Sequence, residues 1–211
     1  MLSFVRGAGL KSRLLNPAEE MWDRRLGIRT FGFLDMVGEP GARDWRAHYV
    51  PVRYKRLLAA LRHVGLAGDD VFLDLGCGLG RTVFAASWLG AKRALGVEID
   101  PGLVEQARRN LAGSKLAGRD IEFICQPAQA FVPTGVTLLF MFHPFGAGTM
   151  EQVVQQLDAE LDRAPRRLRV VYENPIHASV LEASRHLRPT GRWKAGENGS
   201  DYECAFFEAR A

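Results

Sequence analysis

Short apolar runs alternate with segments of helical periodicity from Val71 onward. Five runs have the length and composition of buried strands. They cover residues 71–75, 94–98, 121–125, 136–142 and 168–172. This alternation is typical of a parallel sheet with helices on its faces, so the pattern predicts an α/β fold.

Two crossover helices are predicted between these runs. Asp100 and Pro101 supply an N-cap and a first-turn proline for a helix over residues 101–112. Thr149 and Gln152 form a predicted capping box ahead of a second apolar stripe. Both helices would connect neighbouring parallel strands.

The C-terminal part of the chain departs from this alternation. Asn198-Gly199 lies between the runs 192–197 and 202–209. An Asn-Gly pair between two such runs is a strong short-range signal for a β-hairpin. We therefore expect the parallel strands to be followed by an antiparallel pair.

The N-terminal part is less regular. Residues 57–64 have the apolar periodicity of an amphipathic helix, with Arg56 expected off its apolar stripe and Gly65 as its stop. We expect residues 1–51 to form a helical cap or lid, and residues 52–211 to form the main domain.

The first apolar run ends in an acid followed by three alternate glycines. Gly76, Gly78 and Gly80 place bare backbone at the carboxyl edge of the sheet, beside the start of a helix, so a ligand is expected to approach closely. Glu98 follows Gly80 by 18 residues and ends the next strand at the same edge. Its carboxylate can accept hydrogen bonds from both hydroxyl groups of a ribose, which predicts a cofactor that contains a nucleoside.

The glycine spacing distinguishes two cofactor classes. Dinucleotide-binding folds use G-x-G-x-x-G, whereas here the third glycine comes one residue earlier. Asp74, two residues before Gly76, would repel a pyrophosphate but suits the ammonium group of an amino acid. The pattern therefore favours S-adenosyl-L-methionine (SAM). A nicotinamide-dependent oxidoreductase and a non-catalytic SAM-binding module remain the alternatives.

The motifs DLGCGLG and GVEIDP resemble motifs I and II of the class I SAM-dependent methyltransferases. The stretches WDRRLGIRT, HYVPVRY, FMFHPFG and RVVYENPIHASVLEAS are similar to a bacterial group of methyltransferases of largely unassigned substrate. The glycine motif is also like that of the non-SET protein-lysine methyltransferases. The resemblance implies a Rossmann-like, doubly wound seven-stranded sheet with an antiparallel last strand. It also implies methyl transfer from SAM, with S-adenosyl-L-homocysteine as product.

The resemblance assigns the cofactor residues by position. The glycine turn would meet the methionine end, and the ends of the next strands would meet the ribose and adenine. The expected cofactor residues are Asp74, Gly76, Cys77, Gly78, Gly80, Glu98, Ile99, Ala128 and Gln129. The family commonly has Gly-Asp-Ala after the third strand, where this chain has Gln126-Pro127-Ala128. Gln129 or the backbone of Ala128 is expected to replace the missing acid.

Two residues are catalytic candidates. His143 ends the fourth strand, where related proteins tend to have asparagine, and is expected to act as base or to position the acceptor. Its alternative role is a hydrogen bond to a backbone carbonyl. Tyr49 is expected to close over the methionine end, with aromatic packing as its alternative. Other cap residues expected at the acceptor pocket are Trp22, Asp23, Thr30 and Trp45.

Three further residues lie at the same edge. Arg81 follows the glycine turn and is expected either at the cofactor carboxylate or in an ion pair with a neighbouring acid. Glu173 and Asn174 end the fifth strand, where they would contact the substrate. The alternative for Asn174 is to cap the next helix.

Charge distribution and one motif limit the kinds of methyl acceptor that we expect. Residues 1–62 hold 12 of the 28 Lys and Arg but only 6 of the 24 Asp and Glu. Aromatic residues do not interleave with these charges, and the chain has HPFG where nucleobase methyltransferases more typically have Asn/Asp-Pro-Pro-aromatic, so we do not expect nucleic acid. The expected acceptor is a nitrogen or oxygen of a protein or small molecule.

Metal sites and membrane spans are not indicated. The three cysteines and five histidines have no metal-ligand spacing, so we expect no metal and treat the cysteines as small buried hydrophobes. No apolar run approaches the roughly 20 residues that cross a bilayer. We expect a cytoplasmic monomer or weak dimer.

Overall fold

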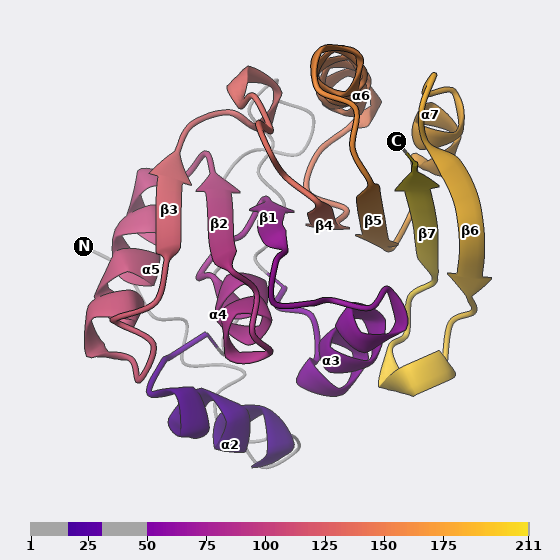
Figure 1. Cartoon of the computed structure of the whole chain (residues 1–211). Helices are drawn as coiled ribbons and strands as arrows, with labels where there is room; N and C mark the ends of the chain where they lie inside the picture. The colour runs from indigo at the N-terminus through magenta and orange to yellow at the C-terminus, as the bar shows by residue number, and fades with distance from the viewer. Residues whose placement is uncertain (1–16, 31–49, 211) are drawn as a thin grey trace, which may run out of the picture.

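A single sheet runs through the middle of the described residues, in the strand order β3-β2-β1-β4-β5-β7-β6 (Figure 1). The structure is a computed structural model that describes residues 17–30 and 50–210. Its strands are β1 (Val71–Leu75), β2 (Arg93–Glu98), β3 (Ile121–Cys125), β4 (Leu138–Phe142), β5 (Leu168–Glu173), β6 (Arg188–Trp193) and β7 (Cys204–Ala209). Strands β1 to β5 pair in parallel, and β7 pairs antiparallel with both β5 and β6. The predicted seven-stranded α/β sheet with a reversed last strand is confirmed.

Helices cover both faces of this sheet (Figure 1). The helices are α2 (Pro17–Leu26), α3 (Tyr54–His63), α4 (Arg81–Trp88), α5 (Pro101–Gly113), α6 (Ala147–Arg163) and α7 (Ala178–Glu182), with short 3-10 turns η1 (Ala128–Ala130) and η2 (Glu197–Gly199). The helices α3, α4 and α5 pack on one face, with α2 outside them against α3, and α6 and α7 pack on the other face. This two-sided cover is the doubly wound arrangement. No helix in the described part of the chain is long and apolar enough to cross a membrane.

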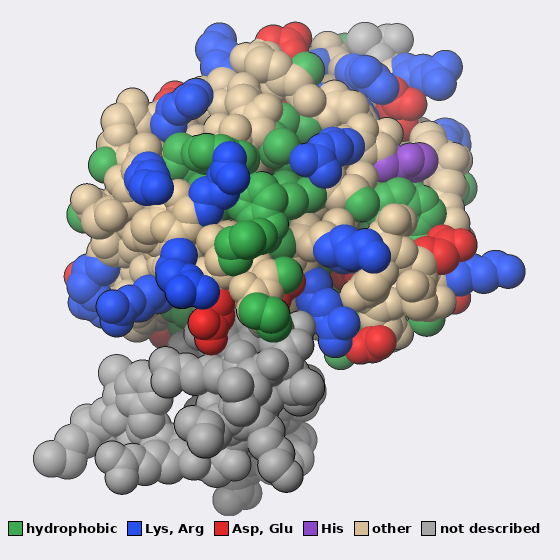
Figure 2. Space-filling model, turned by 90° about the horizontal axis from the view of Figure 1, so that it is seen from below, with side chains coloured by type: hydrophobic (Ala, Val, Ile, Leu, Met, Phe, Trp, Pro, Cys, Tyr) green, Lys and Arg blue, Asp and Glu red, His purple; other side chains and the backbone are tan. Residues whose placement is uncertain are grey.

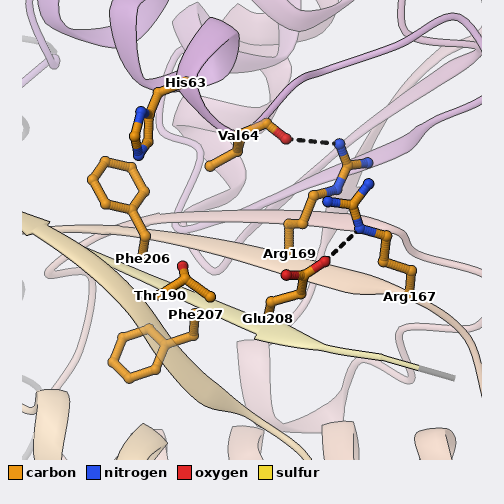
Figure 3. A pocket seen from close by; sticks show the side chains of 8 residues that line it. All are labelled: His63, Val64, Arg167, Arg169, Thr190, Phe206, Phe207 and Glu208. Atoms are coloured by element: carbon orange, nitrogen blue, oxygen red, sulfur yellow. Dashed lines mark hydrogen bonds and ion pairs between the residues drawn. The ribbon is translucent and has the colours of Figure 1, made fainter.

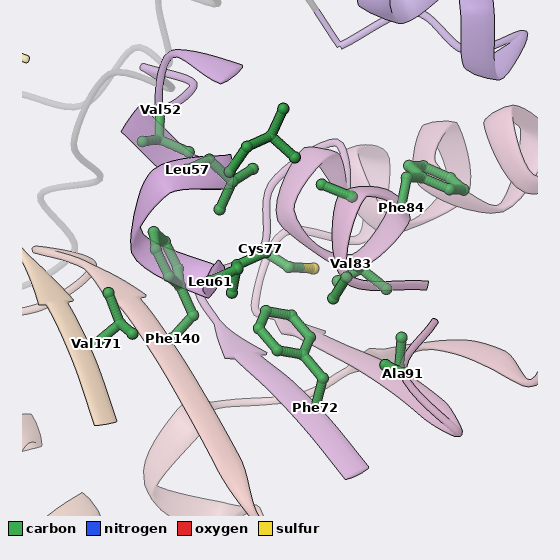
Figure 4. Close-up of a cluster of buried hydrophobic side chains, with 14 of the residues drawn as sticks. Val52, Leu57, Leu61, Phe72, Cys77, Val83, Phe84, Ala91, Phe140 and Val171 are labelled. Atoms are coloured by element: carbon green, nitrogen blue, oxygen red, sulfur yellow. The ribbon is translucent and has the colours of Figure 1, made fainter. Parts of the chain in front are cut away.

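Each face of the sheet has its own apolar core because strand side chains alternate between the faces. Phe72 of β1 points into the first core, where Leu57 and Leu61 of α3 meet Phe140 of β4 (Figure 4). Leu73, the next residue of β1, points into the second core. Burying a side chain of this size contributes about 1.5–3 kcal/mol. The two cores hold the strand ends, and with them the carboxyl edge, in place.

The predicted crossover helices exist, but one begins at a different residue. Asp100 is the N-cap of α5, and its side chain accepts hydrogen bonds from the N–H groups of Gly102 (2.7 Å) and Leu103 (3.0 Å). The capping box on Thr149 is wrong, because α6 already begins at Ala147. Strand β4 likewise starts at residue 138 rather than 136.

The antiparallel pair at the C-terminus is confirmed, but its turn is not the tight hairpin that was predicted. Asn198 and Gly199 adopt the expected left-handed conformation, with φ of 52° and 78°. They lie in η2, within a longer connection between β6 and β7. A tertiary contact fixes this connection, since Arg56 Nη1 donates to the carbonyl oxygen of Glu197 at 2.6 Å.

Arg56 contradicts the prediction that the basic residues of α3 lie off its buried face. Its side chain is 0% exposed, and its Nε lies 3.0 Å from Oε2 of the equally buried Glu173. The guanidinium also donates to the carbonyl oxygen of Tyr202 and lies 4.9 Å from the ring centre of Trp193. A charge can be buried when its donors are satisfied in this way. Glu173 therefore holds the buried arginine, and its expected contact with the substrate stays a prediction.

The cysteines are only partly as expected. Cys77 and Cys204 are buried, as predicted for small hydrophobes, whereas Cys125 at the end of β3 is exposed. Strand β3 neighbours only β2, so it has an open side. The edge position explains the exposure of its last residue.

Candidate active site

The three alternate glycines form a turn between β1 and α4 at the carboxyl edge. Gly76, Gly78 and Gly80 have φ of 82°, 53° and 86°. This left-handed conformation costs other residues about 1–2 kcal/mol each. The N–H groups of Gly76 and Cys77 both donate to the carbonyl oxygen of Val97, at 2.8 and 3.1 Å. The turn is thereby fixed to the end of β2.

Two of these glycines are also required by packing within the protein. A Cβ atom at Gly76 would lie 2.4 Å from Cβ of Pro144, which follows β4. A Cβ atom at Gly80 would lie 2.5 Å from the ring of Phe123 in β3. Any side chain at these positions would force the turn away from its neighbours, so the glycines serve the fold as well as a ligand.

The structure brings Glu98 to the glycine turn, as the sequence predicts. Its Oε2 accepts a hydrogen bond from the N–H of Gly78 at 3.0 Å. Its Oε1 accepts from the N–H groups of Ile99 (2.8 Å) and Asp100 (3.0 Å). A carboxylate has about four acceptor sites, so these three donors leave room for a hydroxyl group. The backbone holds the carboxylate in one orientation beside the turn.

Asp74 is buried under the same turn. It is 3% exposed and accepts a hydrogen bond from the hydroxyl of Thr82, the second residue of α4. Burial raises the pKa of Asp74 to about 7; the bond from Thr82 opposes this rise and the charge of Glu98 adds to it. A cation bound nearby would favour the charged carboxylate.

The adenine-side candidates lie at the ends of β2 and β3. Ile99 is 53% exposed directly after β2. Ala128 and Gln129 lie in η1 and are half-buried. The N–H of Gln126 donates to the carbonyl oxygen of Glu98 at 3.0 Å, which joins the segment before η1 to the ribose-side acid. An exposed apolar side chain and a short turn therefore flank the predicted adenine position.

Cys77 differs from the other cofactor candidates because its side chain turns away from the edge. It is 5% exposed and lies in the first core, next to Gly96 (Figure 4). Burial raises the pKa of its thiol well above the ordinary value. A bound ligand at the turn would meet the backbone of Cys77 and not its sulfur.

His143 ends β4 at the same edge in an uncommon conformation. Its φ is 36°, and its N–H donates to the carbonyl oxygen of Glu173 at 3.2 Å. Its Nδ1 is buried without a hydrogen-bond partner among the described residues, so the alternative of a carbonyl contact finds no support there. Burial and the nearby His177, whose ring centroid lies 5.4 Å away, lower the pKa of His143. Both causes favour the neutral imidazole.

The neighbouring strand β5 ends in the same way. Asn174 has φ of 51°, and both His143 and Asn174 precede a proline. Residues before proline normally favour extended conformations, so two adjacent strand ends are strained. Asn174 does not cap α7, whose N-cap position is His177. His177, whose ring lies beside that of His143, was not among the residues singled out from the sequence, although the two residue-proline pairs at one edge were a signal for it.

The described cap residues make contacts within the protein, and their expected place in an acceptor pocket stays a prediction. Asp23 and Thr30 are 6% and 0% exposed and are bonded to each other, and Trp22 stacks on Tyr54. Tyr49 and Trp45 lie outside the described residues.

Arg81 takes the second of its two predicted roles. It is 2% exposed, and its Nη1 lies 2.6 Å from Oε2 of Glu19 in α2. The ion-pair interpretation is therefore confirmed.

Comparison with known proteins identifies the central part of the chain. Residues 72–166 match the family model described as a methyltransferase domain. The match covers 95 of the 211 residues, from β1 to the residues just before β5. An RNA methyltransferase from Salinibacter ruber, crystallised with S-adenosyl-L-homocysteine, has a TM-score of 0.60 at 20% identity and covers 76% of this chain and 94% of its own. The chain therefore has the class I SAM-dependent methyltransferase fold.

Curated relatives match parts of this chain. The ribosomal protein L11 methyltransferase of Thermus thermophilus is 38% identical over 100 residues, 47% of this chain and 38% of that protein. The protein-lysine N-methyltransferase of Saccharolobus islandicus is 36% identical over 72 residues, 34% of this chain and 45% of that protein. The chain thus spans less than half the length of each of these relatives.

A cavity of about 200 Å³ lies away from the carboxyl edge of the sheet (Figure 3). It is lined by His63, Val64, Arg167, Arg169, Thr190, Phe206, Phe207 and Glu208. Arg167 pairs with Glu208 at 2.5 Å, and Arg169 donates to the carbonyl oxygen of Val64 at 2.9 Å. Because Arg167 and Arg169 lie at the start of β5, this cavity opens at the opposite edge of the sheet and is not part of the candidate active site.

The surface on the side of α2, α3 and α4 is basic (Figure 2). Lys and Arg side chains surround apolar ones on this face, and few acids are visible. In α3 and the residue before it, Arg53, Lys55 and Arg62 are exposed. Within residues 17–30 and 50–210, no group of three or more His, Cys, Asp or Glu could hold a metal ion, and the expectation of no metal stays a prediction.

Proposed function

We propose that this chain is a SAM-dependent methyltransferase that moves a methyl group to a nitrogen or oxygen of a protein or small-molecule acceptor. One observation carries the proposal: the glycine turn and the ribose-side acid meet at the carboxyl edge, where Glu98 Oε2 lies 3.0 Å from the N–H of Gly78. The methyltransferase domain match over residues 72–166 supports it. A nicotinamide-dependent oxidoreductase gains no such support.

The residues present fit SAM. The glycine turn offers bare backbone and the start of α4 to the carboxylate of the methionine part, and Asp74 beneath it suits the ammonium group. Glu98 would accept a hydrogen bond from a ribose hydroxyl, and Ile99 would contact the adenine. Gln129 and the backbone of Ala128 would replace the acid that the family usually has. Bound SAM supplies a methyl group that is already activated by the positive sulfur.

Little further chemistry is then required of the protein. Methyl transfer is an in-line displacement, so alignment of the acceptor and exclusion of water are the main tasks. An amine or hydroxyl acceptor must also lose a proton. The lowered pKa of His143 favours the neutral imidazole, and its Nδ1 has no partner among the described residues, so it suits the role of base.

The acceptor class rests on the relatives. Curated relatives named for ribosomal protein L11 and for protein lysine favour a protein nitrogen. The solved RNA methyltransferase shares the fold alone, and the basic face in Figure 2 would suit RNA as well as an acidic protein. The expectation against nucleic acid therefore stays a prediction.

The test is transfer of labelled methyl from SAM into cell extract, followed by protease or ribonuclease treatment of the product. We expect label that protease releases and ribonuclease does not. Glu98→Gln should reduce the labelling at limiting SAM, whereas Glu182→Gln, the same change on the exposed end of α7, should not. Label released by ribonuclease would overturn the acceptor class. A protein that binds SAM but labels no extract fraction would be the non-catalytic module.

A further inference from the structure

The N-terminal segment of the described chain is docked onto the helices that flank the glycine turn. The carbonyl oxygen of Leu26 accepts from the N–H of Lys115 at 3.0 Å, just after α5. The backbone of Arg29 exchanges two hydrogen bonds with the Asn110 side chain in α5, at 3.0 and 3.2 Å. Asn110 Nδ2 also approaches the carbonyl oxygen of Leu79, inside the glycine turn, at 3.5 Å. Residues 17–30 therefore reach the cofactor turn through α5.

Arg81 makes a second and stronger link. It is the first residue of α4 and follows Gly80 directly. Its Nη1 donates to Glu19 Oε2 (2.6 Å) and to the carbonyl oxygen of Val52 (3.0 Å). Its Nε donates to Thr30 Oγ1 at 2.8 Å. The side chain of a turn residue is thus held by two residues of the N-terminal segment.

The groups that hold Arg81 are themselves fixed. Both carboxylate oxygens of Glu19 accept from the N–H of Tyr54, at 3.1 and 3.3 Å. Asp23 accepts from the N–H and hydroxyl of Thr30 (2.6 and 2.7 Å) and from the hydroxyl of Tyr54 (2.7 Å). The ring of Tyr54 lies 4.6 Å from the Arg81 guanidinium. These bonds fix Glu19 and Thr30, the groups that hold the Arg81 side chain, and so limit the movement of the glycine turn.

We propose that Arg81 is a positioning residue for SAM, through which residues 17–30 hold the glycine turn in its binding conformation. The inference rests on the proposed function. Because Gly80 and Arg81 are consecutive, the anchored side chain fixes both the last glycine and the first turn of α4. The guanidinium is directed at Glu19, Thr30 and Val52, so backbone N–H groups at the start of α4 are left to meet the cofactor carboxylate.

The test compares Arg81→Met with Arg169→Met. Arg169 is also buried and paired, with Asp70, but lies at the opposite edge of the sheet. Calorimetric titration with SAM and thermal unfolding are measured on both. Both variants should lose stability, since each leaves a buried acid unpaired. Only Arg81→Met should weaken SAM binding, by about tenfold, the effect of a coupling of ordinary size.

Glu19→Gln keeps an acceptor for Tyr54 and removes the charge that holds Arg81. It should weaken SAM binding in the same direction, and its effect should not add to that of Arg81→Met. If Arg81→Met does not fold, the SAM affinity of Glu19→Gln alone tests the proposal. Variants that bind SAM as the wild type does would overturn the positioning role and leave the proposed function intact. A wild-type protein that binds no SAM would overturn both.

Discussion

The two halves of the carboxyl edge are built differently. At the ends of β1 and β2, the left-handed positions are glycines and the ribose-side acid has three backbone donors. At the ends of β4 and β5, the left-handed positions are His143 and Asn174, each before a proline. The imidazole nitrogen Nδ1 of His143 is buried without a partner among the described residues.

The contrast matches what each half is proposed to bind. SAM is the same molecule for every enzyme that uses it. A site of glycines and acids whose hydrogen bonds are already made within the protein is therefore suited to bind it. The acceptor half keeps two left-handed residues before prolines, at a cost of about 1–2 kcal/mol for His143, and a buried Nδ1 without a partner among the described residues. We infer that this half is shaped for one acceptor, and that the two halves can be disabled separately.

The largest expected effect is on the acceptor half. Arg56→Met leaves Glu173 buried without its partner, directly before Asn174, and should reduce the free energy of unfolding by about 3–5 kcal/mol. Affinity for SAM, measured by calorimetry at a temperature where the variant is folded, should change little. Arg62→Met, exposed on the same helix, should stay within about 0.5 kcal/mol in denaturant unfolding. If Arg56→Met lost SAM affinity together with its stability, the two halves of the edge would not be separable.

Gly76→Ala should damage both halves, because Gly76 is where they touch. The new Cβ would lie 2.4 Å from Cβ of Pro144, in a backbone conformation with φ of 82°. We expect a loss of about 2–4 kcal/mol in the free energy of unfolding, together with loss of SAM binding. Gly148→Ala, inside α6 with open space around it, should be neutral or stabilising by up to about 1 kcal/mol.

His143→Asn should separate chemistry from binding. Asparagine tolerates the left-handed conformation but has no basic nitrogen. We expect kcat to fall by about 100-fold while SAM affinity is kept. The wild-type rate should rise with pH through a pKa below 6.5 and stay level above it, because the neutral imidazole is the base. Wild-type turnover in this variant would remove the assignment, and His186→Asn, paired with Asp162 on the surface, is the control.

The smallest effect is proton release from Asp74. Its pKa of about 7 lies above the ordinary 3.8, so folding favours the protonated acid and its contribution to stability is lost as pH rises through 7. The ammonium group of SAM would favour the carboxylate, so binding at pH 6 should release a fraction of a proton. Titration in two buffers of different ionisation enthalpy measures this release. Asp74→Asn should release no proton on binding SAM. If this variant released as much as the wild type, the proton would come from another group.

Local signals predicted where the glycine turn, Asp74 and Glu98 lie. The glycines act through their own backbone, and both acids lie in strands that periodicity locates. The acceptor half and the cap depend on contacts between distant segments, such as Arg56 with Glu173 and Arg81 with Glu19. An amphipathic pattern places a charged residue on the surface unless its partner is known, so the burial of Arg56 was not predictable. The position of the β6–β7 turn depends on the same arginine.

The most direct test is calorimetric titration of wild type, Glu98→Gln and His143→Asn with SAM, S-adenosylhomocysteine and NAD. We predict that wild type and His143→Asn bind both sulfur nucleosides with equal affinity, that Glu98→Gln binds them at least about tenfold more weakly, and that NAD gives no heat. Unchanged affinity in Glu98→Gln, or binding of NAD in place of SAM, would contradict the assignment of the cofactor half.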